Sequence, residues 1–273
     1  MPSIPFRQIR KLCAAVSLGL AASLTLSPAQ AEAPTLEPGT LKVGMDITYP
    51  PFESYDGDEV VGLDPDLARL LAQKLGTDVE FIDTRFAGLV LGLGARRFDT
   101  VISGMYIIPE RLEQAQAIPY GRTGAAILVR AGAENPPTRP EDLCGMSVGL
   151  QQGTTWVAQL GELSEQYCVP NGHGPINIQE FASAPEATQA MLSNNIQAQM
   201  EIRGAALMIA ERTRDRVEVS TTELIYPQTI GIFLRKDDQA LHDAIVAALD
   251  ELKASGDYQA LLDQYGLEPP TES

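Results

Sequence analysis

The sequence predicts an α/β protein made of two lobes. Two parts of the chain each alternate short β-branched runs, which are typical of buried strands, with amphipathic helical segments. Two further apolar runs, at 126–129 and 230–234, are expected to be strands that leave the first lobe and return to it. The proline-rich stretch at 134–140 is typical of a surface connector. Paired crossings of this kind predict a hinge between the lobes.

The first lobe is expected to follow the order strand, helix, strand, helix, strand, which gives a parallel sheet with right-handed crossovers. These elements are assigned to 41–45, 64–75, 79–82, 86–95 and 101–102. Asp64 is expected to cap the first helix, with Pro65 at its first position. Pro50 and Pro51 cannot continue a strand ladder, so 46–53 is expected to be a loop.

The second lobe is predicted to repeat the alternation of strands and helices. Its elements are assigned to a strand at 146–150, a helix from near 154, a helix after 183, a strand at 196–202 and a helix at 204–210. Ser183 and Glu186 have the spacing of a capping box. Two amphipathic helices, at 241–252 and 258–265, follow the returning strand.

Length, composition and charge limit the classes of function that the protein can have. The chain has 273 residues, enough for one large domain or two modest ones, and its hydrophobic content of 44% is typical of a globular protein. The net charge of −16 argues against nucleic acid and anionic membranes as partners, because phosphate binding needs a basic surface. We find neither a phosphate-binding glycine motif nor a histidine–cysteine cluster with metal-ligand spacing, so no cofactor or metal is expected.

Residues 1–31 have the pattern of a cleaved signal peptide. A basic start is followed by an apolar run at 12–26, and Ala29-Gln30-Ala31 fits the cleavage site. The mature protein is therefore expected to be exported, to begin near Glu32 and to be soluble. No later apolar stretch approaches the roughly 18 residues that a membrane span needs.

The mature chain keeps two cysteines, Cys144 and Cys168, whereas Cys13 belongs to the predicted signal peptide. Export permits disulfides, and an even pair in an exported protein most simply forms one. The bond is expected to add about 3 kcal/mol of stability.

Two residues are candidates for binding an anion. Arg111 lies just beyond the strand at 101–102, where open α/β sheets place ligands, and its guanidinium can hold a carboxylate with two hydrogen bonds. Thr155 lies at the predicted start of a helix, where free N–H groups and its hydroxyl form an anion site. The alternatives are a surface arginine in a helical turn and an ordinary threonine cap, and these segments alone do not separate the two interpretations.

Five motifs occur in order and carry a family resemblance. They are Thr48-Tyr49-Pro50-Pro51-Phe52-Glu53, Gly62-Leu63-Asp64-Pro65-Asp66-Leu67, Phe98-Asp99-Thr100-Val101-Ile102-Ser103-Gly104-Met105, Pro109-Glu110-Arg111 and Gln152-Gly153-Thr154-Thr155. By this ordered set, residues 39–267 resemble the solute-binding proteins of polar-amino-acid ABC transporters, solute-binding family 3. The resemblance implies a two-lobed periplasmic-binding-protein fold of type II, with lobes at 32–123 plus 229–273 and at 124–228.

The resemblance also implies a ligand and its contacts. A monomer would close around an amino acid and deliver it to a membrane permease. Arg111 would bind the α-carboxylate together with the N–H and hydroxyl of Thr155. Tyr49 and Phe86 match the aromatic positions on either side of the ligand side chain, although either could instead be lobe core. The remaining expected contacts are Gly104 and Asp46; Asp46 could meet a distal cationic group or only order its own loop.

The chain departs from the family at the amine end of the ligand. Ile202 stands where family members commonly carry the aspartate that holds the α-ammonium, while Tyr106 and Ile108 replace hydroxyl residues. Glu201 is adjacent, but strand alternation directs it to the opposite face unless the strand end twists. We therefore expect a carboxylate-bearing ligand whose amine is substituted, quaternary, displaced or absent, within a partial aromatic cage formed by Tyr106 and the two aromatic residues above.

Two other functions remain open from the sequence. Cyclohexadienyl dehydratases resemble this family, and such an enzyme would need an acid in the cleft, for which Glu201 is the nearby candidate. A sensory ligand-binding module is the other alternative. We predict a binding protein rather than an enzyme, because no catalytic set assembles in the sequence.

Overall fold

One continuous sheet organises residues 33–271, the part of the chain that the computed structural model describes. Its strand order is β5-β1-β6-β12-β7-β10-β8-β9, with β11 added beside β7. At one end lie the parallel strands β5 (Asp78–Asp83), β1 (Thr40–Met45) and β6 (Thr100–Val101). At the other end lie the parallel strands β10 (Ala198–Ile202), β8 (Ser147–Gln151) and β9 (Asn177–Phe181). The predicted signal peptide, 1–31, lies outside the described residues.

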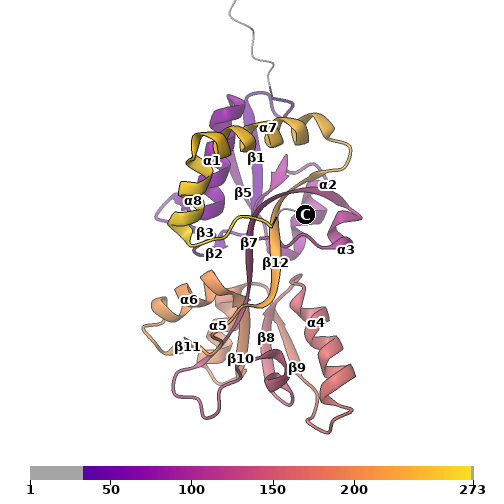
Figure 1. Ribbon diagram of the computed structural model, residues 1–273, viewed down its shortest axis with the longest axis vertical. Helices are drawn as coiled ribbons and strands as arrows, with labels where there is room; N and C mark the ends of the chain where they lie inside the picture. The colour runs from indigo at the N-terminus through magenta and orange to yellow at the C-terminus, as the bar shows by residue number, and fades with distance from the viewer. Residues whose placement is uncertain (1–32, 272–273) are drawn as a thin grey trace, which may run out of the picture. The chain divides into compact units, whose positions relative to one another are not determined.

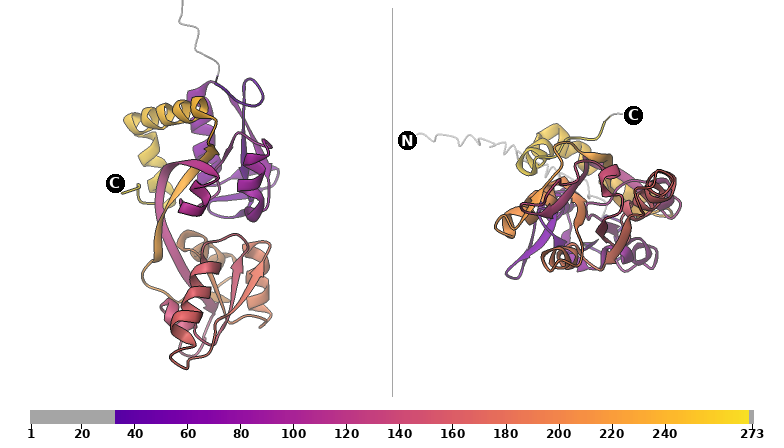
Figure 2. Two further views of the ribbon diagram at one scale, coloured as in Figure 1. Left: turned by 90° about the vertical axis from the view of Figure 1, so that its right-hand side faces the viewer. Right: turned by 90° about the horizontal axis from the view of Figure 1, so that it is seen from below.

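Two long antiparallel strands join these groups. They are β7 (Ala115–Arg130) and β12 (Ile225–Arg235), which run side by side from one group to the other (Figures 1 and 2). The prediction at 126–129 captured only the end of β7, the part that pairs with β10. The earlier part of β7 contains Pro119, Gly121 and Gly124 and pairs with β12 across a register shift, so it lacks the simple alternation of a strand.

Helices cover both faces of the sheet in the first lobe, as predicted for an α/β layer. One group consists of α1 (Leu63–Leu75), α7 (Gln239–Ser255) and α8 (Asp257–Tyr265), which pack against one another (Figure 1). A separate core joins α2 (Leu89–Gly94) to β6 and β12 around the buried Phe98. The predicted helix at 86–95 begins with a 3₁₀ turn, η1 (Phe86–Gly88).

The second lobe and the junction contain the remaining elements. The helical segments of the second lobe are η2 (Pro140–Leu143), α4 (Trp156–Leu163), η3 (Ser164–Cys168), α5 (Ala184–Leu192) and α6 (Arg203–Arg212). The last strand of this lobe is β11 (Val217–Val219). Ser183 precedes α5 as predicted, but its side chain makes no capping hydrogen bond. The short helix α3 (Pro109–Leu112) precedes β7 in the first lobe. None of the helices between residues 33 and 271 combines the length and the hydrophobicity that a membrane span requires.

Two predictions near the first helix were wrong in detail, and both differences affect the site. The segment 46–53 is not only a loop, because β2 (Thr48–Tyr49) and β3 (Glu53–Asp56) pair there, followed by β4 (Glu59–Val61). Asp64 does not cap α1, since the helix already begins at Leu63 and the Asp64 carboxylate turns inward to buried partners.

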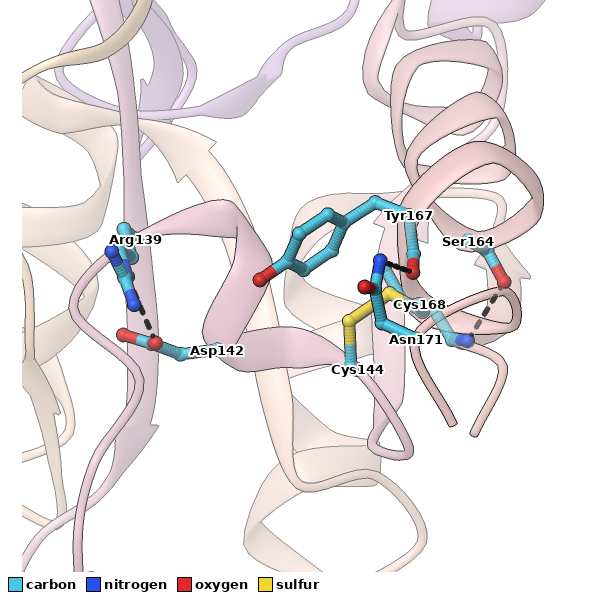
Figure 3. Close-up of a disulfide and its surroundings, with 8 residues drawn as sticks. Arg139, Asp142, Cys144, Ser164, Tyr167, Cys168 and Asn171 are labelled. Carbon is cyan, nitrogen blue, oxygen red and sulfur yellow. Dashed lines mark hydrogen bonds and ion pairs between the residues drawn. A yellow bond between two sulfur atoms is a disulfide. The ribbon is translucent and has the colours of Figure 1, made fainter. Parts of the chain in front are cut away.

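The predicted disulfide is present between Cys144 and Cys168 (Figure 3). It ties the end of η2 to η3, with the two Cα atoms 5.3 Å apart. Nearby, the Ser164 hydroxyl accepts a hydrogen bond from the Ile176 N–H at 2.9 Å, which holds the following loop against the same turn.

Replacing both cysteines by alanine is expected to lower the free energy of unfolding by about 3 kcal/mol, because the bond closes a short loop in the unfolded chain. Urea unfolding of the mature protein measures the loss, and chemically reduced wild type should show a similar one. Equal stability of the oxidised wild type and the double variant would contradict the expectation.

Candidate functional site

A cavity lies between the two lobes, and most of the predicted site residues line it. From the first lobe these are Asp46, Tyr49, Phe86, Gly104, Tyr106 and Arg111, and from the second lobe Thr155. The wall also contains Ile202, which the sequence analysis identified as a departure from the family, and five residues that it did not select: Glu53, Ser103, Gln151, Thr154 and Trp156. The volume open to the centre of a water molecule is about 20 Å³, so the lobes lie close together.

Arg111 is the buried cation of this cavity, with 8% of its surface exposed. Its Nη1 donates to the Tyr106 carbonyl at 2.7 Å, and its Nη2 donates across the lobes to the Gly153 carbonyl at 2.9 Å. The guanidinium also lies 5.4 Å from the centre of the Phe86 ring. Within 33–271 no carboxylate forms an ion pair with Arg111, and burial lowers its pKa to about 10. The hydrogen-bond partners of this buried positive charge are therefore two neutral carbonyl groups.

The start of α4 faces this cation from the second lobe. Thr155 precedes the helix and Trp156 is its first residue, and both line the cavity. The Thr155 hydroxyl and the Trp156 indole nitrogen are buried and have no hydrogen-bond partner among the described residues. Thr154 instead donates its hydroxyl to the Gln151 carbonyl at 2.8 Å, which shapes the turn before the helix. Polar groups without partners thus gather on the wall opposite Arg111.

Asp46 orders its own loop and also links the lobes. Its Oδ2 accepts hydrogen bonds from the Phe86 N–H and from the Gln151 side-chain amide, both at 2.9 Å. Its Oδ1 accepts the Thr48 hydroxyl at 2.7 Å and lies 3.7 Å from Arg85. Burial raises the pKa of Asp46, and these hydrogen bonds oppose that rise. These contacts order the loop of Asp46, and because Asp46 also lines the cavity, its contact with a distal cationic group of a ligand stays a prediction.

The aromatic side chains Tyr49, Phe86 and Tyr106 share the cavity wall. Tyr49 stacks on Phe52 with the ring centres 5.7 Å apart, and its hydroxyl accepts the Ile202 N–H at 3.0 Å across the lobes. The Tyr106 ring meets the edge of Trp156, with ring centres 6.0 Å apart, and its hydroxyl is buried without a partner among the described residues. Tyr49 and Tyr106 are therefore buried at the cleft rather than in the core of one lobe alone.

Glu201 and Ile202 lie on opposite faces of β10, as strand alternation requires. Ile202 lines the cavity, whereas Glu201 is fully buried and does not. The Glu201 Oε1 accepts the Gln199 side-chain amide at 2.7 Å, and burial raises the pKa of Glu201 to about 7. Glu201 was included among the candidate ligand contacts, but the structure does not bring it into the cavity with the others.

A buried polar cluster supports the floor of the cavity. The Tyr120 hydroxyl and the Gly104 N–H each donate to Asp64 at 2.6 Å, and the Ser103 hydroxyl donates to Glu53 at 2.5 Å. Gly104 has φ +53°, a backbone conformation that favours glycine and directs its N–H to Asp64. Burial raises the pKa of Asp64 to about 6, while burial and the neighbouring Asp64 carboxylate raise the pKa of Glu53 well above its usual range.

The residues that the sequence analysis missed carried weak signals. Glu53 and Ser103 occur inside motifs that supported the family resemblance, but as part of the pattern rather than as site residues. Trp156 directly follows the predicted anion site at Thr155, so its position was a usable signal. Gln151 is the last residue of the strand before that turn. Its place in the cavity follows from its hydrogen bond to Asp46 in the other lobe, which the sequence does not reveal.

The raised pKa values of Glu53 and Asp64 predict that stability falls as the pH rises. The folded protein keeps protons that the unfolded chain releases near its ordinary pKa values of 4.5 and 3.8. The decline therefore runs from about pH 4 upward through about pH 6. Glu53→Gln retains the side-chain size but does not titrate, so its decline should be shallower. Urea unfolding across this pH range measures both curves, and parallel curves would show that Glu53 does not hold the proton.

Comparison with known proteins places the chain in a family. The family model for bacterial extracellular solute-binding proteins, family 3, matches residues 41–268. The L-cystine-binding protein TcyJ of Escherichia coli (strain K12) is 32% identical over 84% of this chain and 83% of its own length. An ancestral arginine-binding protein bound to arginine superposes with a TM-score of 0.73 at 33% identity, covering 83% of this chain and 98% of the other.

The ancestral amino acid-binding protein AncCDT-1, described as a precursor of cyclohexadienyl dehydratase, has a TM-score of 0.70 and 32% identity, covering 83% of this chain and 95% of the other. These neighbours share the two-lobed fold that the sequence predicted. The chain therefore belongs to family 3 of the bacterial extracellular solute-binding proteins.

Proposed function

We propose that this protein is the periplasmic solute-binding component of an ABC importer. Its lobes, at 32–123 plus 229–273 and at 124–228, would close on an amino acid or on a carboxylate-bearing derivative with an altered amine. The observation that carries the proposal is Arg111, a buried cation between the lobes without a carboxylate partner among the described residues. The relatives named above are binding proteins for cystine and arginine, which supports an amino acid as cargo.

The physical reason lies in the cost of burying a charge. An ion in a closed cavity loses hydration, and carbonyl dipoles replace only part of it. A ligand carboxylate would supply the missing countercharge and bidentate acceptors to Arg111. The same carboxylate would accept the hydroxyl of Thr155, which comes from the other lobe. Ligand binding would thus favour closure, because the contacts exist together only when the lobes meet.

The cavity residues that would face the amine of the ligand differ in chemistry from those that would face its carboxylate. Ile202 lines the cavity where a family aspartate would offer a carboxylate, and the neighbouring Glu201 lies behind the wall. Tyr49, Phe86 and Tyr106 instead present aromatic surface, which suits a substituted or quaternary ammonium. We extend the proposal to a ligand whose amine is modified, displaced or absent.

An enzyme of the cyclohexadienyl-dehydratase type is the second candidate, and the structural likeness to AncCDT-1 is the reason to keep it. The acid considered for it, Glu201, lies outside the cavity, whereas the carboxyl groups of Asp46 and Glu53 line it. Loss of prephenate or arogenate on incubation with the protein would favour the enzyme instead.

The proposal also covers location and partners. The pattern of residues 1–31 and the extracellular family support export to the periplasm. We propose that the protein acts as a monomer that delivers its ligand to a membrane permease.

Arg111→Met should raise the dissociation constant of the amino acid that binds best by about 30-fold or more, since truncating one partner of a buried charge pair is costly. Titration calorimetry measures the constant. Arg139→Met, in the exposed η2 turn, is the matched control and should bind like wild type. Equal affinity of the Arg111 variant and wild type would refute the role of Arg111.

N-methylated and quaternary analogues of an amino acid should bind more tightly than the parent, because the aromatic wall receives a diffuse cation while no carboxylate stands at Ile202. Calorimetry with each parent and analogue pair tests this expectation. Micromolar or tighter binding of an ordinary α-amino acid, without preference for its analogues, would contradict the proposal that the ligand has an altered amine. It would not affect the proposal that Arg111 binds a carboxylate.

A further inference from the structure

Trp156 is the first residue of α4 and forms part of the cavity wall next to Thr155. It is only 2% exposed, and its ring meets Tyr106 from across the lobes with an interplanar angle of 83°. This edge-on contact fixes the position of the indole in the closed form. Trp156 is also the single tryptophan of the chain.

The indole N–H of Trp156 has no acceptor among residues 33–271 although it is buried. An indole nitrogen can only donate, so a neighbouring hydroxyl proton or another N–H cannot satisfy it. Buried donors in native proteins nearly always have acceptors. Because Trp156 lines the cavity, an acceptor atom of a ligand or of a water molecule bound there would satisfy this donor.

Arg111 and Thr155 indicate which acceptor is expected. Arg111 has five N–H groups, of which the contacts to the Tyr106 and Gly153 carbonyls use two. A carboxylate offers about four acceptor sites, and a guanidinium fork uses two of them. The Thr155 hydroxyl can take a third. The fourth can go to either of two donors of the second lobe, the Thr155 N–H or the Trp156 indole N–H, and only the indole is observed to be buried without an acceptor among the described residues.

We infer that the Trp156 indole N–H donates to the ligand carboxylate, so that Trp156 is a specificity-determining residue of the site. The inference rests on the proposed function and adds a donor to it. Because Trp156 belongs to the second lobe and Arg111 to the first, the additional bond would strengthen closure on ligands that carry a carboxylate. A tryptophan that serves only as an apolar wall would not need its N–H.

The experiment removes the N–H while keeping an aromatic ring. The ligand is chosen by calorimetry on wild type from the standard L-amino acids, L-cystine and glycine betaine. The tightest of these is then measured alongside its carboxylate-free amine counterpart. The test variant is Trp156→Phe, and Tyr167→Phe, a half-exposed aromatic beside the disulfide, is the control.

Trp156→Phe should weaken binding of the carboxylate ligand by about tenfold or more, which is typical for a hydrogen bond to a charged group. It should leave binding of the carboxylate-free amine nearly unchanged, and the control variant should match wild type for both. An equal loss for both ligands, or no loss for either, would overturn the assignment of Trp156.

A second form of the protein tests the same point if the phenylalanine variant folds poorly. Replacement of tryptophan by benzothienylalanine during expression changes residue 156 alone and exchanges the N–H for sulfur within a ring of nearly the same shape. The same selective loss of affinity for the carboxylate ligand is expected.

The outcomes separate the two proposals. If wild type binds no member of the panel, the proposed function fails and the inference fails with it. If wild type binds a ligand and the changes at Trp156 do not alter its affinity, the inference alone fails.

Discussion

The hydrogen bond from Arg111 to the Gly153 carbonyl connects the two lobes at the point where the site forms. Arg111 reaches this position because β6 ends at Val101 and α3 begins only eight residues later, which directs the guanidinium across the cleft. Two more contacts support the same closed arrangement, from Gln151 to Asp46 and from the Ile202 N–H to Tyr49. The protein thus supplies neutral hydrogen-bond partners for a buried cation. An anionic ligand would stabilise the charge of Arg111 more strongly than these partners do.

The cavity floor shows how the fold holds the site in place. Asp64 belongs to α1, Tyr120 to β7 and Gly104 to the loop after β6, and their hydrogen bonds fasten three elements together beneath the cavity. These hydrogen bonds restrain the loop that carries Gly104 and Tyr106, although the Glu53 Oε2 in the same floor is buried without a partner among the described residues. The departure from the family at position 202 lies in the wall above this floor.

The fold class and the disulfide were predicted from hydrophobic periodicity and from the two cysteines of an exported chain, whereas most of the predicted residues of the cavity wall came from the family resemblance. Helix α1 and strands β1 and β5 lie where hydrophobic periodicity placed them. The long strand β7 was predicted only in part, since its proline and glycines conceal its pairing with β12. The inward turn of Asp64 and the cavity positions of Glu53 and Gln151 depend on contacts between distant segments, which no local pattern contains.

A crystal structure of the protein with its bound ligand shows directly whether Arg111 holds a carboxylate. We expect a ligand carboxylate within hydrogen-bond distance of the Arg111 guanidinium and the Thr155 hydroxyl at once, with the lobes closed around it. A ligand seated elsewhere, or one that directs an uncharged group to Arg111, would refute this role of Arg111.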